Sequence, residues 1–160
     1  MTPRATTRGA VREERVDQVA GHLLPRAAAL TRLLLKEVRA DISRTEAGVL
    51  GTLIAGPRRI TELAELEGLA QPTMTLLVQR LEQRGWVKRG CHADDGRVVL
   101  VSLTDPGRAR LEEFRAQVGA ALRVHMDAMS DEQIAALETA TTSLGSLVDV
   151  LQGGASTEVT

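Results

Sequence analysis

The stretch "AQPTMTLLVQRLEQRGWVKRGCHADDGR", residues 70–97, decides the fold of this chain. It opens with polar residues around Pro72 and continues with apolar residues at helical spacing from Met74 to Leu81. The helical pattern ends at Gly85, and "GWVKRG" and "RVVLVSLT" then read as two strands joined by the turn "CHADDG". The stretch therefore predicts a helix with a polar leading end, followed directly by a basic hairpin.

Length and composition limit what surrounds this stretch. A chain of 160 residues suggests one domain, or one domain with dimer-forming extensions. The hydrophobic content of 43% suffices for a core, and with one Trp, one Phe and no Tyr that core must be aliphatic, as in helices rich in Leu and Ala. A single Cys excludes an internal disulfide and fits a reducing cytoplasm. The sequence contains no run of 18 apolar residues, so no membrane span is expected.

Charge is spread unevenly along the chain. The formal net charge of −1 divides into +3 for residues 1–55, +2 for residues 56–110 and −6 for residues 111–160. A local basic surface is therefore expected in the first two thirds, rather than a uniformly basic protein. Residues 1–10 lack the apolar core of a signal peptide and are expected to form a flexible tail, as are residues 153–160.

Two short helices are predicted before the opening stretch. Ser43 with Glu46 forms a capping-box start, and Gly56 and Pro57 end that helix. The segment "ITELAELEG" is a second helix of about two turns, ended by Gly68. The helix of the opening stretch, over 71–84, begins soon after, so the two are joined by a tight turn.

Longer helices are predicted on both sides of this core. Apolar residues recur at helical spacing over 11–39, where Pro25 is expected to bend or split the helix near residues 21–24. After the hairpin, Thr104 or Asp105 caps a helix that runs to about residue 127. A last helix, up to residue 151, starts at a second capping box formed by Ser130 and Gln133.

This order of elements predicts the fold class: mainly α with a small β-hairpin wing. Two short helices with a tight turn, followed by a hairpin, form a winged helix-turn-helix over 43–104. The helices over 11–39 and 105–151 flank it as dimerisation helices, so that 11–152 is a single unit. The second short helix of such a unit enters the major groove of DNA with its N-terminal residues leading. Small or polar residues there can reach base edges or phosphates: Gln71, Thr73, Thr75 and Gln79.

The chain resembles the MarR-type (multiple antibiotic resistance regulator) transcription factors over residues 12–150. The resemblance rests on "ISRTEAGVLGTL", on "RITELAELEGLAQPTMTLLVQRLEQRGWVKR" and on "DDGRVVLVSLTDPG", in this order and at the family's spacing. The last of these, an Asp-x-Arg wing followed by Leu-Thr-x-x-Gly, is the most diagnostic. The resemblance implies an obligate homodimer whose first and last helices interlock, with each subunit reading half of a pseudo-palindromic operator. It also implies a repressor that a small-molecule effector releases.

Two positions depart from the family pattern. Ala70 stands where relatives usually have a serine, and an alanine can neither cap the helix nor bind a phosphate. Leu76 stands where an arginine is common, so one base or phosphate contact of relatives is expected to be missing. The operator sequence of a relative is therefore not expected to apply to this chain.

The predicted DNA contacts are the polar residues of the second helix and the basic residues that flank it. A solvated charged surface is the alternative for Arg58, Arg59, Lys88 and Arg89. Arg97 is expected to reach the minor groove, braced by Asp94 or Asp95, whereas Arg84 is expected to face solvent or a carboxylate. The full set of predicted contacts is Arg58, Arg59, Gln71, Pro72, Thr73, Thr75, Gln79, Arg80, Lys88, Arg89, His92, Asp95 and Arg97.

The remaining candidate residues predict less. Cys91 beside His92 suggests an oxidant sensor, an alternative to effector control, but a lone Cys in a wing is more often incidental. Neighbours on a strand face opposite sides and no third orienting group is evident, so no enzyme is predicted. No phosphate-binding or metal-ligand motif occurs and the three histidines are far apart in sequence, so no metal site or cofactor is predicted either. His22 and Arg26, one helical turn apart, are candidates to hold an anionic effector, with exposed helix surface as the alternative. A module used only for protein–protein contact is the other class of function left open.

Overall fold

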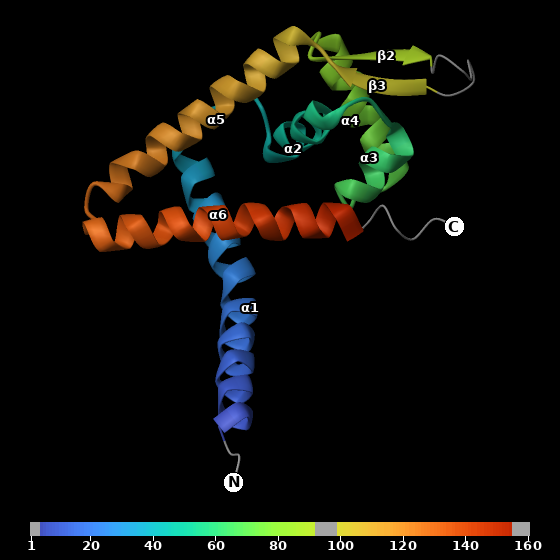
Figure 1. Cartoon of the computed structure of the whole chain (residues 1–160). Coiled ribbons are helices and arrows are strands. Elements are labelled where there is room, and N and C mark those ends of the chain that lie inside the picture. Colours follow the sequence, from blue (N-terminus) through green and yellow to red (C-terminus); the bar gives the residue numbers. More distant parts are fainter. Residues whose placement is uncertain (1–3, 92–98, 155–160) are drawn as a thin grey trace. The chain divides into compact units, whose positions relative to one another are not determined.

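The computed structural model describes residues 4–91 and 99–154 of the chain. They fall into two compact units, Met1–Gly119 and Ala120–Thr160. The prediction of a mainly helical fold with a small β-hairpin wing is confirmed (Figure 1). Along the chain the elements are α1 (Arg4–Glu37), α2 (Arg44–Thr52), the 3-10 turn η1 (Leu53–Ala55), β1 (Arg58–Arg59), α3 (Ile60–Leu66), α4 (Gln71–Gln83), β2 (Val87–Cys91), β3 (Val99–Leu103), α5 (Asp105–Met126) and α6 (Asp131–Gly154).

The sheet has three strands rather than the predicted two. Its order is β1-β3-β2, with both pairings antiparallel. Arg58 pairs with Val101 and Arg59 with Leu100, so two residues predicted only as flanking charges form an edge strand. A strand this short has no alternation of its own for a pattern to reveal. It exists because β3 offers a free edge beside the segment that leads into α3.

An aliphatic core lies beneath the helix-turn-helix, as the composition predicts. Its most deeply buried members come from α2, α3, α4, β3 and α5 and are Val49, Leu50, Leu63, Met74, Val78, Leu81, Val101 and Leu111. The two large aromatic residues lie at its edge, since Trp86 is 9% exposed and Phe114 only packs against the cluster from outside. The position of α4 is thus fixed by its apolar side.

Both predicted capping boxes form. The Ser43 N–H donates to Glu46 Oε2 at 2.7 Å, and the Glu46 N–H donates to Ser43 Oγ at 3.2 Å. At the start of α6 the Ser130 N–H donates to Gln133 Oε1 at 3.0 Å, and the Gln133 N–H donates to Ser130 Oγ at 3.3 Å. Each box gives two otherwise unbonded N–H groups of a first turn an acceptor, which explains where these helices begin.

The start of α5 explains the Leu-Thr-x-x-Gly motif. Thr104 is the capping residue: its Oγ1 accepts from the Gly107 N–H at 3.1 Å and donates to the Gly85 carbonyl at 2.6 Å. The Thr104 N–H donates to the Trp86 carbonyl at 3.1 Å. A Cβ on Gly107 would stand 2.8 Å from that carbonyl carbon, closer than real contacts allow. The motif therefore joins α5 directly to the turn that ends α4.

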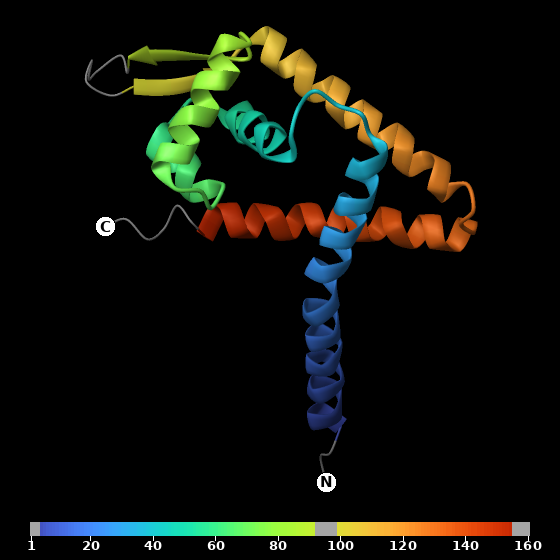
Figure 2. The ribbon, with the colours of Figure 1, turned by 180° about the vertical axis from the view of Figure 1, so that it is seen from behind.

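Helix α1 is longer than predicted. It begins at Arg4 rather than near residue 11, so most of the predicted N-terminal tail is helical. The segment after Pro3 contains no further proline until Pro25, and the glycines Gly9 and Gly21 do not end the helix. Pro25 does not split the helix, which is continuous to Glu37, but its axis bends between the blue and cyan parts (Figure 2).

The second unit consists of the last part of α5 together with α6. Apolar residues of α6 at alternating spacings of three and four are exposed, including Leu137, Leu144, Val148 and Leu151. The segment Asp131–Leu151 is long and apolar enough to cross a membrane by length and composition alone. One such helix is weak evidence for a membrane, because the interface helices of soluble proteins have the same composition. The exposed apolar stripe of α6 is better explained as a surface that binds another protein segment.

Candidate nucleic-acid interface

Helices α3 and α4 form a helix-turn-helix. Gly68 in the connecting turn has φ 64, a left-handed conformation that favours glycine. The Leu69 N–H donates to the Ala64 carbonyl at 2.8 Å and the Gly68 N–H donates to the Glu65 carbonyl at 3.2 Å. These bonds close the last turn of α3 and direct the chain into α4, so the leading end of α4 is set by the turn.

Helix α4 has one buried face and one exposed face. Met74, Leu77, Val78 and Leu81 are at most 3% exposed. The opposite face carries exposed residues, which are Gln71, Pro72, Thr73, Leu76, Gln79 and Arg80. The structure therefore brings nearly all the predicted base-reading residues together on one surface.

The first turn of α4 has backbone N–H groups that no side chain caps. Ala70 makes no side-chain capping bond, as expected for alanine, and Pro72 lies within the first two helical positions. The N–H groups that precede Met74 in the first turn therefore receive no side-chain acceptor from Ala70, an arrangement that suits an anion. Thr75 is half-buried, and its hydroxyl donates to the Gln71 carbonyl at 2.9 Å. Its hydroxyl hydrogen is thus used within the helix and is not available to a base or a phosphate.

The basic residues predicted to contact DNA differ in their exposure and in their partners within the protein. Arg59 and Lys88 are exposed. Arg58 is half-buried, and its Nε is buried with no hydrogen-bond partner in the described part of the chain. Arg89 is held by α4, since its Nε lies 3.2 Å from Glu82 Oε2 and its N–H donates to Glu82 Oε1 at 3.3 Å. This pair joins strand β2 to the helix, a role that the sequence pattern did not reveal.

The tip of the wing lies outside the described residues. Strands β2 and β3 pair from Val87 opposite Leu103 to Cys91 opposite Val99. Three predicted contacts fall on the connection 92–98, namely His92, Asp95 and Arg97, and so stay predictions. The paired strands give that connection two fixed ends beside α4.

The candidate effector residues lie on one side of α1. His22 and Arg26 are both exposed, one turn apart on the continuous helix. Their placement agrees with the alternative of exposed helix surface as well as with a ligand site completed by another element. Among the described residues, no group of three or more His, Cys, Asp or Glu side chains is placed to hold a metal ion.

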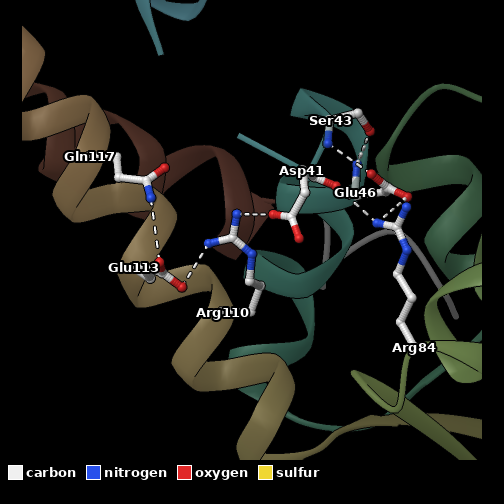
Figure 3. A network of polar contacts seen from close by, with 7 residues as sticks. All are labelled: Asp41, Ser43, Glu46, Arg84, Arg110, Glu113 and Gln117. Carbon is white, nitrogen blue, oxygen red and sulfur yellow. Dashed lines mark hydrogen bonds and ion pairs between the residues drawn. The ribbon is translucent and has the colours of Figure 1, made fainter. Parts of the chain in front are cut away.

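A polar network behind α4 was only partly predicted (Figure 3). Arg84, expected to face solvent or a carboxylate, lies 3.5 Å from the buried Glu46 and stacks over the Trp86 ring at 4.8 Å. Arg110 on α5 forms ion pairs with Asp41, in the α1–α2 connection, and with Glu113 at 3.0 Å. The sequence left Arg84 open between solvent and a carboxylate partner, and no sequence signal marked Asp41.

Comparisons with known proteins identify the same region. Residues 43–99 match the model of the MarR family. The HTH-type transcriptional repressor YetL of Bacillus subtilis (strain 168) is 36% identical over 73 residues, 46% of this chain and 44% of YetL. The repressor MdtR of the same organism is 30% identical over 79 residues, 49% of this chain and 51% of MdtR. The chain thus spans about half the length of these two relatives.

A solved structure extends the likeness to most of the chain. A MarR family protein from Bacillus stearothermophilus is 27% identical and superposes with a TM-score of 0.63 over 86% of this chain and 97% of that one. The two relatives above are named as transcriptional repressors and neither as an enzyme, in agreement with the prediction of a non-enzymatic protein. Residues 43–99, which include α2, the helix-turn-helix and strand β2, thus match the MarR family, and most of the chain is similar to a solved MarR family structure.

Proposed function

We propose that the chain is a cytoplasmic, sequence-specific DNA-binding repressor that acts as a homodimer. The observation that carries the proposal is the exposed face of α4, polar at its leading end and held by a fully apolar inner face. Such a helix inserts its first turns into the major groove, and a wing beside it contacts the adjacent backbone or minor groove. The repressor names of YetL and MdtR support the direction of regulation.

Binding to a selected operator and to random DNA of equal length tests this function. Gln71→Ala and Thr73→Ala should weaken operator binding more than random binding, by roughly 1–3 kcal/mol where a base contact is lost. Gln83→Ala is the matched control, because Gln83 is an exposed glutamine at the other end of α4. Equal losses on both DNAs would assign Gln71 and Thr73 to phosphate contacts.

The same titration decides the other class of function. A module used only for protein–protein contact gives no salt-dependent binding to either DNA. Wild type that binds neither DNA at low salt would overturn the DNA-binding proposal. Equally strong binding of wild type to both DNAs would show that the chain binds DNA without sequence specificity.

A small-molecule effector forms the second part of the proposal. His22 and Arg26 offer hydrogen-bond donors to an anion, and exposed aliphatic residues of α1 itself, such as Val19 and Leu30, suit an apolar tail. Straight-chain carboxylates from hexanoate to decanoate are suitable probes, with release of bound operator as the readout. Arg26→Ala should abolish a response that Arg32→Ala, another exposed arginine of α1, retains. Unchanged release in both variants would show that the effector does not bind at Arg26.

A further inference from the structure

Leu76 is exposed on a face of α4 that is polar apart from Pro72. It is 62% exposed, whereas the adjacent Leu77 is 3% exposed and belongs to the core. Thr73 and Gln79 lie three residues away on either side, and therefore share its face of α4. The side chain of Leu76 thus adds little to the stability of the helix-turn-helix.

Exposure alone does not distinguish Leu76, because single exposed leucines are common on protein surfaces. Leu66, near the turn at the end of α3, is 60% exposed and is such a residue. Leu76 differs in position, since it is the sixth residue of α4 and lies at the centre of the face that bears Gln71, Thr73 and Gln79. A protein-docking surface would need a contiguous apolar patch, and the only apolar neighbour of Leu76 on this face is Pro72, one turn before it.

The chemistry of the major groove offers one group that suits a leucine. Base edges there present hydrogen-bond donors and acceptors, together with one apolar substituent, the C5-methyl group of thymine. A leucine cannot satisfy a donor or an acceptor, so it disfavours the other bases by leaving their polar edges without water. A leucine flanked by hydrogen-bonding side chains therefore matches a thymine flanked by bases with polar contacts.

We infer that Leu76 is a specificity-determining residue that packs on a thymine methyl group in each half of the operator. This inference rests on the proposed DNA-binding function. The sequence predicts that a base or phosphate contact made by an arginine in relatives is missing at position 76. The inference assigns an apolar contact to this position instead. An arginine at this position would favour guanine instead, so the operator preference of this chain should differ from that of relatives with arginine there.

Removal of single methyl groups from DNA tests the contact. An operator is first selected with the full-length protein, and each thymidine of one half-site is then replaced by deoxyuridine, which lacks only the methyl group. With wild type, one position should lose affinity about threefold to fivefold, as expected for one buried methyl group. With Leu76→Ala, deoxyuridine at that position should cause no further loss.

Matched variants separate the outcomes. Leu66→Ala should keep the wild-type deoxyuridine profile, and both leucine variants should keep the helical signal because both side chains are exposed. If wild type binds its operator specifically and Leu76→Ala shows the same methyl dependence, the Leu76 contact is overturned while the DNA-binding function stands. If wild type selects no sequence at all, the proposed function itself fails.

Discussion

The guanidinium of Arg84 donates a hydrogen bond from Nη1 to the main-chain carbonyl of Asp41 at 3.0 Å (Figure 3). This bond joins the residue that caps the C-terminal end of α4 to the connection between α1 and α2. The carboxylate of Asp41 pairs with Arg110 on α5, so one residue meets cations from two helices. The position of α4 therefore depends on contacts behind it as well as on its apolar face.

Arg84→Ala should lower the free energy of unfolding by about 1–2 kcal/mol. The change leaves Glu46, whose side chain is 7% exposed, without its cation, but the effect is moderated because Arg84 itself is 44% exposed. Urea unfolding followed by circular dichroism at one fixed protein concentration measures it. Arg80→Ala, one turn earlier and exposed, should leave stability within about 0.5 kcal/mol. Equal stabilities of the two variants would show that the Arg84 contacts contribute nothing.

Gly107→Ala should destabilise the fold by at least about 2 kcal/mol. The added methyl group would overlap the carbonyl group of Trp86 and stand 3.0 Å from Cδ1 of Leu103. The start of α5 would have to move away from the turn that follows α4. Gly119→Ala, further along α5 with open space at its Cβ, is the matched control and should be neutral or slightly stabilising. A Gly107→Ala protein that unfolds with the wild-type midpoint would contradict this packing.

Local signals explain which parts of the fold the sequence predicts. The capping boxes at Ser43 and Ser130 are each encoded within four residues, and both form as predicted. The buried and exposed faces of α4 follow from helical spacing alone. Arg58 and Arg59 were predicted correctly as neighbours of the helix-turn-helix but not as a strand, because β1 depends on an edge supplied by β3.

Contacts between distant residues explain what the sequence does not predict. Arg84 and Asp41 are 43 residues apart, and their bond involves a main-chain carbonyl, which no side-chain pattern can mark. Arg89 was predicted as a phosphate contact, yet its pairing with Glu82 shows a competing role inside the protein. A charged residue in a sequence has several potential partners, and only the fold selects among them.

Leu144→Asp should weaken the proposed homodimer. Leu144 belongs to the apolar stripe of α6 and is 39% exposed within one chain, so it has surface available to a second copy. Wild type at micromolar concentration should sediment at about twice 17.2 kDa, and the variant should shift toward 17.2 kDa. Ser146→Asp, on the opposite side of α6, should leave the mass unchanged. A folded wild-type monomer at that concentration would rule the dimer out.

Cys91→Ser should bind the operator normally, and peroxide should release neither wild type nor the variant. Cys91 ends strand β2 opposite Val99, and a lone cysteine without a second thiol has no internal partner for a disulfide. Operator binding before and after peroxide treatment provides the measurement. Release of wild type but not of the variant would establish the redox alternative instead.

Arg97→Ala should reduce operator affinity about tenfold or more and make the salt dependence shallower by about one unit. Arg97 lies in the connection 92–98, after "HADDG", where the resemblance to MarR-type proteins implies an arginine directed at the minor groove. The negative potential of a narrow groove favours a planar, permanently charged guanidinium.

The fold should tolerate this change, because residues of α2, α3, α4, β2, β3 and α5 already build the core beneath the helix-turn-helix. Helical signal and sedimentation mass should therefore match wild type. Asp95→Ala should show a milder loss of affinity, since it removes only the expected brace of Arg97, and Arg123→Ala, an exposed arginine at the end of α5, serves as the charge-matched control. If Arg97→Ala binds the operator as wild type does at physiological salt, the wing makes no DNA contact through this residue, and the assignment of Lys88 and Arg89 to the interface fails with it.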